Sequence, residues 1–239
     1  IPATFQQGDR VLFDHFGISG TVSNTAVKIS GALSPGHVSV CSAIDYTFEG
    51  TGTLTGTMKL VKTGKGTLSI NNSNSFTGGT IVWDGVLLIN GSHSGTVTVH
   101  GGTSGGVSSG ALSGGRLGGS GILNSNLSLE EKGAIIPGNG MGSTGTLTVN
   151  GNVSFSKSSY CGFDISEIPA GDKDLLTITG DLIIKDTISF FFNLLNGAPS
   201  PGDYPLIQYT GSITGAINNV LISGLDLIPC LIYQSGKII

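Results

Sequence analysis

Aliphatic residues alternate with Ser and Thr in short runs along most of this chain. Residues 67–70, 96–99, 146–149 and 176–179 each place aliphatic side chains on one face of an extended strand and hydroxyls on the other. Gly, Asn, Ser and Asp separate the runs, and Gly interrupts almost every block of ten residues, which disfavours helices. The pattern predicts an all-β protein.

The turns leave two kinds of β fold open. Strands that recur every ~8–12 residues suit a sandwich or barrel, or a solenoid with several strands in each coil. Asp84-Gly85, Asn90-Gly91, Asn150-Gly151 and Asn196-Gly197 are pairs typical of hairpins, and they favour antiparallel strands. Gly-rich stretches at 101–106 and 114–119 are too frequent for hairpin tips and favour the corners of a coil.

Composition narrows the class of protein. The chain has 239 residues, 38% of them hydrophobic and 11% charged, which predicts a packed fold and not a disordered segment. Its 40 Gly show no three-residue period of the collagen type. Only 11 scattered Lys and Arg and a net charge of −4 argue against a nucleic-acid partner. No apolar run is long enough for a membrane span, so we expect no membrane insertion by this chain.

Cysteine and histidine usage indicates no metal or cofactor. Three widely spaced cysteines exclude a dense disulfide framework and paired zinc knuckles, and they are expected as small apolar fillers. Four histidines show no spacing typical of metal ligands. These residues are Cys41, Cys161, Cys230, His15, His37, His93 and His100. The chain begins at Ile1 without Met, and we expect a processed protein or part of a longer one.

One segment resembles the autotransporter-associated β-strand repeat. The residues that carry the resemblance are the Lys-x-Gly-x-Gly-Thr-Leu strand at 62–68, the Asn-x-Phe-Thr-Gly-Gly-Thr turn at 74–80, and Gly85-Val86-Leu87, where Val stands for the usual Thr. Residues 115–121, 136–140, 145–149, 174–180 and 202–209 look like later coils of the same proteins. The resemblance covers roughly residues 50–239.

The resemblance implies a right-handed parallel β-helix, secreted or displayed on a bacterial surface, that acts as a stalk, adhesin or fibre without catalytic residues. We expect one domain over 1–239, with first coils at 1–50, repeat-like coils at 51–150 and closing coils at 151–239. The alternation then gives the side chains expected inside the coils. They are Val38, Val40, Leu60, Leu68, Ile70, Val82, Leu87, Ile89, Val97, Val99, Leu117, Ile122, Leu127, Leu129, Leu147, Val149, Val153, Phe155, Leu176, Ile178, Leu182 and Ile184.

Two features predict self-association. The chain starts and finishes on apolar strand-like sequence without a polar cap, so we expect that either further sequence continues beyond the termini or another subunit covers the end coils. Residues 80–89 are apolar on both strand faces, which predicts an exposed patch. The alternatives for this patch are a turn or bulge near Asp84-Gly85 that shifts the register, or a neighbouring loop that covers Trp83. The candidate association residues are Ile1, Phe5, Ile238 and Ile239 at the ends, and Ile81, Trp83, Val86 and Leu88 in the patch.

Other polar residues have structural and functional readings. Asn71, Asn90, Asn126 and Asn152 begin Asn-x-Ser/Thr sequons and are candidate glycosylation sites, although such residues are also typical of β-helix corners. Lys59, Lys62 and Lys65 are expected on a solvated face. Carbohydrate-cleaving β-helices cluster acidic groups on one outer sheet. The nearest candidates are Asp164, Glu167, Asp172, Asp174 and Asp181, for which turn capping is the favoured role.

Three functional hypotheses follow. The first is a non-enzymatic extracellular structural protein whose subunits assemble with one another into a fibre or surface layer. The second is a monomeric passenger adhesin that binds surface glycans. The third is a polysaccharide lyase or hydrolase, which the sequence disfavours because no convergent set of acids and bases can be assembled.

Overall fold

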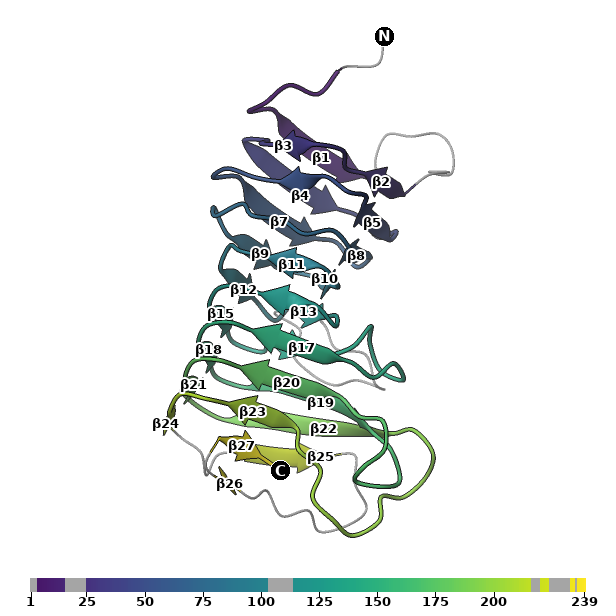
Figure 1. The fold of residues 1–239 in the computed structure, drawn as a ribbon, viewed down its shortest axis with the longest axis vertical. Coiled ribbons are helices and arrows are strands. Elements are labelled where there is room, and N and C mark those ends of the chain that lie inside the picture. Colours follow the sequence, from purple (N-terminus) through teal and green to yellow (C-terminus); the bar gives the residue numbers. More distant parts are fainter. Residues whose placement is uncertain (1–3, 16–24, 103–113, 216–219, 224–232, 235) are drawn as a thin grey trace.

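The computed structural model describes residues 4–15, 25–102, 114–215, 220–223, 233–234 and 236–239. Short strands stack into an elongated ladder, with the first coils at one end and the last coils at the other (Figure 1). The described residues contain no helix. Nearly all strand pairs are parallel and join successive coils, so the predicted all-β fold, a parallel β-helix, is confirmed.

Three stacked sheets form the sides of the β-helix, and each coil contributes strands to them in turn. The first sheet contains β1 (Arg10–Asp14), β4 (His37–Cys41), β7 (Lys59–Thr63), β9 (Thr80–Val82), β12 (Val97–Val99), β15 (Leu127–Leu129), β18 (Val153–Phe155), β21 (Leu182–Ile184) and β24 (Ile213–Gly215). The second contains β2 (Ala26–Lys28), β5 (Tyr46–Glu49), β8 (Thr67–Ile70), β10 (Gly85–Ile89), β13 (Gly115–Gly118), β16 (Ala134–Ile135), β19 (Ser159–Ile165), β22 (Ile188–Leu194) and β25 (Val220–Ser223).

The third side is built in two parts. The larger sheet contains β11 (Ser92–His93), β14 (Ile122–Leu123), β17 (Thr146–Val149), β20 (Leu175–Ile178), β23 (Ile207–Tyr209), β27 (Lys237–Ile238) and β26 (Tyr233–Gln234). A separate pair, β3 (Ala32–Leu33) and β6 (Thr53–Leu54), lies in the early coils. Asn74 connects the two parts, because its backbone bridges His93 and its side chain accepts a hydrogen bond from the Leu54 N–H.

The Asn-Gly and Asp-Gly pairs serve as corners, and the hairpin reading of them is wrong. Asp84-Gly85 lies between β9 and β10, and Asn150-Gly151 lies between β17 and β18, so each pair joins strands of different sheets. Gly85 has a φ of 72°, a left-handed conformation that Gly adopts at no steric cost. The pairs turn the chain around the coil and do not reverse it.

The interior is a continuous column of aliphatic and aromatic side chains. Every side chain expected inside is buried except Ile122, which is 41% exposed. Its neighbour Leu123 points inward instead, in register with His93 of the preceding coil and Val149 of the next. An Ile-Leu pair in a two-residue strand has no polar position to mark its outer face, so only the pairing of neighbouring coils sets which one is buried.

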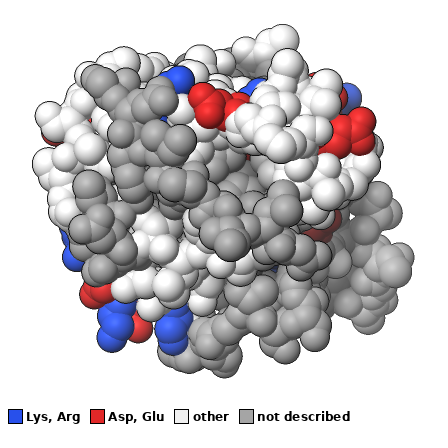
Figure 2. Space-filling view, turned by 90° about the horizontal axis from the view of Figure 1, so that it is seen from below, with Lys and Arg blue, Asp and Glu red and all other residues white. Residues whose placement is uncertain are grey.

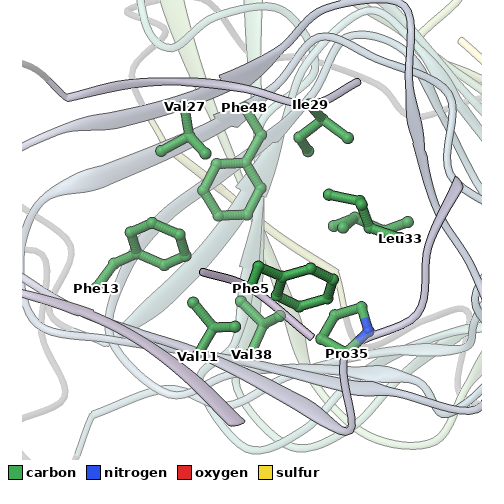
Figure 3. Close-up of a pocket in the computed structure, with 10 residues that line it drawn as sticks. Phe5, Val11, Phe13, Val27, Ile29, Leu33, Pro35, Val38 and Phe48 are labelled. Carbon is green, nitrogen blue, oxygen red and sulfur yellow. The ribbon is translucent and has the colours of Figure 1, made fainter. Parts of the chain in front are cut away.

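Apolar side chains line the N-terminal end of the described β-helix. A cavity of about 200 Å³ lies at this end, and Figure 3 shows the Phe5 ring among the apolar side chains around it. Its lining comes from the first coils and consists of Phe5, Val11, Phe13, Val27, Ile29, Leu33, Pro35, Val38, Phe48 and Leu54. Phe5 remains 36% exposed. Ile1 lies outside the described residues, and association through Ile1 and Phe5 stays a prediction.

At the other end, the chain covers part of its own last coils. β27 pairs antiparallel with β23, and the Leu206 N–H donates to the Ile238 carbonyl over 3.0 Å. Ile238 is fully buried and Ile239 is 7% exposed, so the prediction that these residues form an exposed association surface is wrong. The alternation of the sequence does not reveal that the final strand turns back onto the third sheet. In the view onto this end, the visible Lys, Arg, Asp and Glu side chains lie mainly toward the rim (Figure 2).

Removal of one interior side chain should weaken the whole ladder. Leu87 is fully buried between Leu68 and Leu117 of the adjacent coils. We expect Leu87→Ala to lower the free energy of unfolding by about 2–5 kcal/mol, measured by urea denaturation, because the cavity cannot close between two fixed coils. Leu12, 61% exposed on β1, supplies the control. Leu12→Ala should change stability by less than about 0.5 kcal/mol, and equal effects of the two substitutions would contradict the stacked-column account.

Candidate functional site

Lys62 anchors the first corner of the repeat-like segment from inside the coil. It occupies an inward position in register with Val40 and Val82, and its side chain is fully buried. Its Nζ donates hydrogen bonds to the carbonyls of Thr63, Gly64 and Asp84 at 3.0, 2.6 and 3.2 Å. Burial lowers the Lys62 pKa to about 8, and the Asp84 carboxylate partly offsets that effect.

This position overturns the expected solvated lysine face. Lys59 and Lys65 are exposed, but Lys62 is an interior group that satisfies carbonyls where the strand ladder stops. The sequence alone did not predict this role, because a charged residue at an inward-facing position of a strand is expected to interrupt the alternation of apolar and polar residues and not to lie inside the coil. The signal was available, since Lys62 follows Leu60 with the period of a strand.

The Asn-x-Phe-Thr-Gly-Gly turn closes the third corner by similar means. The Asn74 Oδ1 accepts from the Leu54 N–H at 2.8 Å, and the Asn72 Nδ2 donates to the Gly52 carbonyl at 2.9 Å. Phe76 is fully buried, and its ring meets that of His93 edge-on at 4.6 Å. A Cβ on Gly78 would collide with the Met58 carbonyl oxygen, so this residue must be Gly.

His93 is a buried neutral histidine in the interior column. Its Nε2 lies 3.1 Å from the Thr80 hydroxyl, while its buried Nδ1 has no hydrogen-bond partner among the described residues. Burial lowers the His93 pKa to about 4, so the ring is uncharged at neutral pH. This residue therefore contributes to packing and to pH-dependent stability.

Trp83 is an exposed aromatic residue that directly follows β9 of the first sheet. It is 48% exposed, and its ring stacks on that of His100 at 3.9 Å with an interplanar angle of 14°. Trp83 follows β9 and His100 follows β12, so the two rings come from adjacent coils. Trp83 and His100 therefore form a stacked aromatic pair on the outside of the β-helix.

The predicted patch around Trp83 is only partly present. Ile81 and Val86 are half-buried, but the outward placement of Leu88 is wrong because its side chain is only 7% exposed. A Cβ on Gly118 would lie 3.0 Å from the Leu88 Cδ2, so Leu88 packs over a glycine of the next coil. Because Gly118 has no side chain, the Leu88 side chain can lie against the next coil and stay buried. The alternation within one strand does not show this contact.

The four sequon asparagines lie at corners of the coils, and their side chains form hydrogen bonds with residues of neighbouring coils. The Asn90 Nδ2 donates to the Asn71 Oδ1 at 3.1 Å, and the Asn90 Oδ1 accepts from the Ser120 N–H at 3.2 Å. The Asn126 Oδ1 accepts from the Asn152 N–H, while the Asn152 Oδ1 accepts from the Asp181 N–H, both at 2.8 Å. These contacts support the corner role, and glycosylation at these positions stays a prediction.

The acidic candidates divide into buried and surface groups. Asp164 and Asp174 are fully buried, and their carboxylates accept backbone N–H bonds from Gly142, Ser143 and Gly145 at 2.6–2.9 Å. The second Asp174 oxygen accepts from the Asp164 N–H at 2.9 Å. Burial raises the Asp174 pKa to about 7, although these backbone hydrogen bonds oppose the shift. The geometry matches turn capping, in which both carboxylates hold the loop after β16 against the coil.

Metal-binding and disulfide chemistry is limited in the described part of the chain. Among the described residues, no group of three or more His, Cys, Asp or Glu could hold a metal ion. Cys41 and Cys161 are both free thiols, and burial raises the pKa of Cys161. Cys230 lies outside the described residues. No described helix has the length and apolar character needed to cross a membrane.

Comparisons with known proteins place the repeat in a family. The family model for the passenger-associated-transport-repeat matches residues 60–89, which include the Lys62 and Asn74 corners. The chain is also 32% identical over 204 residues to the adhesin BmaC autotransporter of Brucella suis biovar 1 (strain 1330). Residues 60–89 of the chain are thus a passenger-associated transport repeat. This passenger segment is therefore extracellular or displayed at the bacterial cell surface.

The extents of these matches differ. The similarity to the Brucella adhesin covers 82% of this passenger segment but only 5% of that protein's length. The repeat match spans β7 to β10 and ends at Ile89. Within the passenger segment, Lys62, Asn74 and Gly78 of the repeat motif face inward or close corners, which leaves the outer faces of the sheets for contact with other molecules.

Loss of the buried lysine should open a corner of the passenger repeat. Lys62→Met keeps the aliphatic stem but removes the donor to three carbonyls, and we expect it to lower the free energy of unfolding by about 1–3 kcal/mol in urea denaturation. Lys65→Met is the matched control, because Lys65 lies in the same corner with its side chain exposed. If the two variants are equally stable, the anchoring role of Lys62 is refuted.

His93 should make the fold sensitive to acid. Its folded-state pKa is about 4 against an ordinary 6.5, so the unfolded chain takes up the proton first as the pH falls. This difference in proton uptake lowers the free energy of unfolding by about 3 kcal/mol between pH ~6.5 and pH ~4. We expect the stability difference between wild type and His93→Leu, measured by urea denaturation at both pH values, to shift by that amount in favour of the variant. A difference that stays constant with pH would rule this out.

Proposed function

We propose that this chain is a non-enzymatic adhesive segment of an autotransporter passenger. The observation that carries the proposal is the combination of the passenger repeat at 60–89 with similarity to a protein described as an adhesin. The parallel β-helix supports it, because a ladder of coils projects a long, regular outer surface away from its point of attachment.

The acidic groups support a role without catalysis. A glycosidase needs one carboxylic acid to protonate the leaving group and a second carboxylate that can reach substrate or water. Asp164 and Asp174 are fully buried and hold backbone N–H groups, and Asn193 donates to the remaining Asp164 oxygen at 2.6 Å. These carboxylates therefore act inside the fold and present no acid to the surface.

The adhesive role is tested with the folded chain on a surface. We expect latex beads coated with the purified chain to attach to cultured host cells well above beads coated with albumin, because the folded outer face makes the contacts. Beads coated with chain that has been irreversibly heat-unfolded provide the matched control. Equal attachment of native and unfolded chain would contradict an adhesive role for this fold.

Assembly into a fibre is the second candidate, and the apolar side chains of the first coils favour it. They line a cavity beside Phe5 that a second copy of the chain could cover. The similarity to an adhesin favours attachment over fibre formation, and the pairing of β27 with β23 covers part of the opposite end. We therefore place fibre assembly second.

The fibre hypothesis has a direct measurement. If the N-terminal end recruits a second copy, light scattering after size-exclusion chromatography should give a mass that rises with protein concentration, and Phe5→Asp should return it to that of the monomer. Trp83→Asp should leave the mass unchanged if the end is the contact, and lower it if the patch is. A concentration-independent monomer would exclude self-assembly of this chain.

A further inference from the structure

The chain contains four Asn-Gly pairs, and the fold restrains them to different degrees. They are Asn90-Gly91, Asn139-Gly140, Asn150-Gly151 and Asn196-Gly197. An Asn that precedes Gly is chemically labile, because the backbone nitrogen of the Gly can attack the side-chain amide carbon and no Cβ on the Gly blocks the approach. Hydrogen bonds that hold either group must break before the two can meet, so the folded structure decides which pair reacts.

Asn90 is held at its corner by three hydrogen bonds to neighbouring coils. Its Nδ2 donates to the Asn71 Oδ1 at 3.1 Å, and its Oδ1 accepts from the Ser120 N–H at 3.2 Å. The attacking group is also occupied, since the Gly91 N–H donates to the Ile70 carbonyl at 3.0 Å. Both the amide and the nitrogen that would attack it are therefore fixed in the ladder.

Asn150 is likewise bonded to both neighbouring coils through its pair. Its backbone N–H donates to the Leu123 carbonyl at 2.7 Å, and its Nδ2 donates to the Asn124 Oδ1 at 2.8 Å. On the other side, the Gly151 carbonyl accepts from the Gly180 N–H at 3.1 Å. The peptide that joins the two residues of the pair therefore cannot rotate without loss of ladder contacts.

Asn196-Gly197 lies in an exposed loop between two backbone anchors. The loop joins β22 to β23 and projects beyond the stacked strands (Figure 1). Its anchors are Leu195 and Ser200, whose N–H groups donate to carbonyls at 3.0 and 2.7 Å. Between them, residues 196–199 form no hydrogen bond with the described chain, and a Cβ on Gly197 would meet nothing within 4 Å. This pair can therefore reach the reactive geometry without breaking a hydrogen bond.

The pair at Asn139 is restrained to an intermediate degree. Asn139 is exposed, and its side chain has no hydrogen-bond partner among the described residues. The loop itself is held, because the Gly140 carbonyl accepts from the Ser143 N–H at 3.1 Å, and the Asp164 carboxylate accepts from the same N–H at 2.9 Å. We expect this pair to react more slowly than the pair in the loop after β22.

We propose that Asn196 is a site of spontaneous deamidation in the folded chain. The Gly197 nitrogen loses its proton to solvent and forms a bond with the Asn196 Cγ, while the Cγ–Nδ2 bond breaks and the Nδ2 leaves, with a proton from water, as ammonia. Water then opens either carbonyl of the resulting succinimide ring and gives aspartate or isoaspartate. An amide and water become a carboxylate and ammonium, so the loop gains one negative charge.

The four pairs are compared within one chain. The purified folded chain is incubated at mildly alkaline pH, and peptide mapping by mass spectrometry follows conversion at each Asn, with isoaspartate detected by protein isoaspartyl methyltransferase. We expect Asn196 to convert about tenfold or more faster than Asn90 and Asn150, because tenfold corresponds to ~1.4 kcal/mol in the barrier, about the contribution of one hydrogen bond that must break. Asn139 should convert at an intermediate rate.

Unfolding and two substitutions provide the matched controls. In chain kept unfolded in urea, the four pairs should convert at similar rates, because only their shared dipeptide chemistry remains. Asn124→Ala removes the partner of the Asn150 amide and should speed conversion at Asn150 alone. Gly197→Ala should slow conversion at Asn196, because a Cβ then obstructs the attacking nitrogen. Slow conversion at Asn90 in both variants, together with circular dichroism, checks that the fold is kept.

Two results would overturn the proposal. The first is conversion of Asn90 or Asn150 in the folded chain as fast as that of Asn196, which would show that the ladder hydrogen bonds give no protection. The second is an Asn196 that keeps its amide in the folded chain over the time in which the unfolded chain converts, which would show that the loop is closed to the reaction. Faster conversion of Asn150 in Asn124→Ala would support the assigned role of the amide ladder.

Discussion

The in-register parallel pairing of each coil with its neighbours is the constraint on which this molecule depends. A single coil contributes only a few inward side chains, which cannot form a core alone. Each of these side chains must therefore stack between the equivalent positions of the two neighbouring coils. Leu68, Leu87 and Leu117 illustrate this, because each completes the packing of the next. A shift of one residue in any strand would turn its apolar side chains out of the column.

At the corners of the coils, backbone carbonyl and N–H groups have no partner in the parallel sheets. Several residues of the repeat motif form hydrogen bonds with these groups. Lys62 reaches three carbonyls from inside, and Asn74 replaces a strand residue between β6 and β11. Asp164 and Asp174 do the same for a longer loop in the later coils. The residues that make the repeat recognisable therefore stabilise the fold, and they leave little chemistry for a substrate.

Contact with other molecules falls to the outer faces of the sheets. A rigid ladder holds outward side chains at the spacing of paired strands, so a few exposed groups can act together without rearrangement. Trp83 is an example, because it is 48% exposed and its ring stacks on that of His100 from the next coil. The same rigidity suits the adhesive role proposed above, in which outward side chains would contact another surface.

Alternation and corner chemistry in the sequence determined the class of fold, nearly all of the interior and the outward position of Trp83, because these depend on neighbours within one strand. The parallel arrangement needed the repeat resemblance, since Asn-Gly pairs serve hairpins and corners alike. Only the tertiary structure decided the buried state of Lys62, Leu88 and Ile238 and the exposure of Ile122. Each of those depends on a residue in another coil, such as Gly118 beside Leu88 or β23 beside Ile238, and pairing across coils sets contacts that local pattern does not encode.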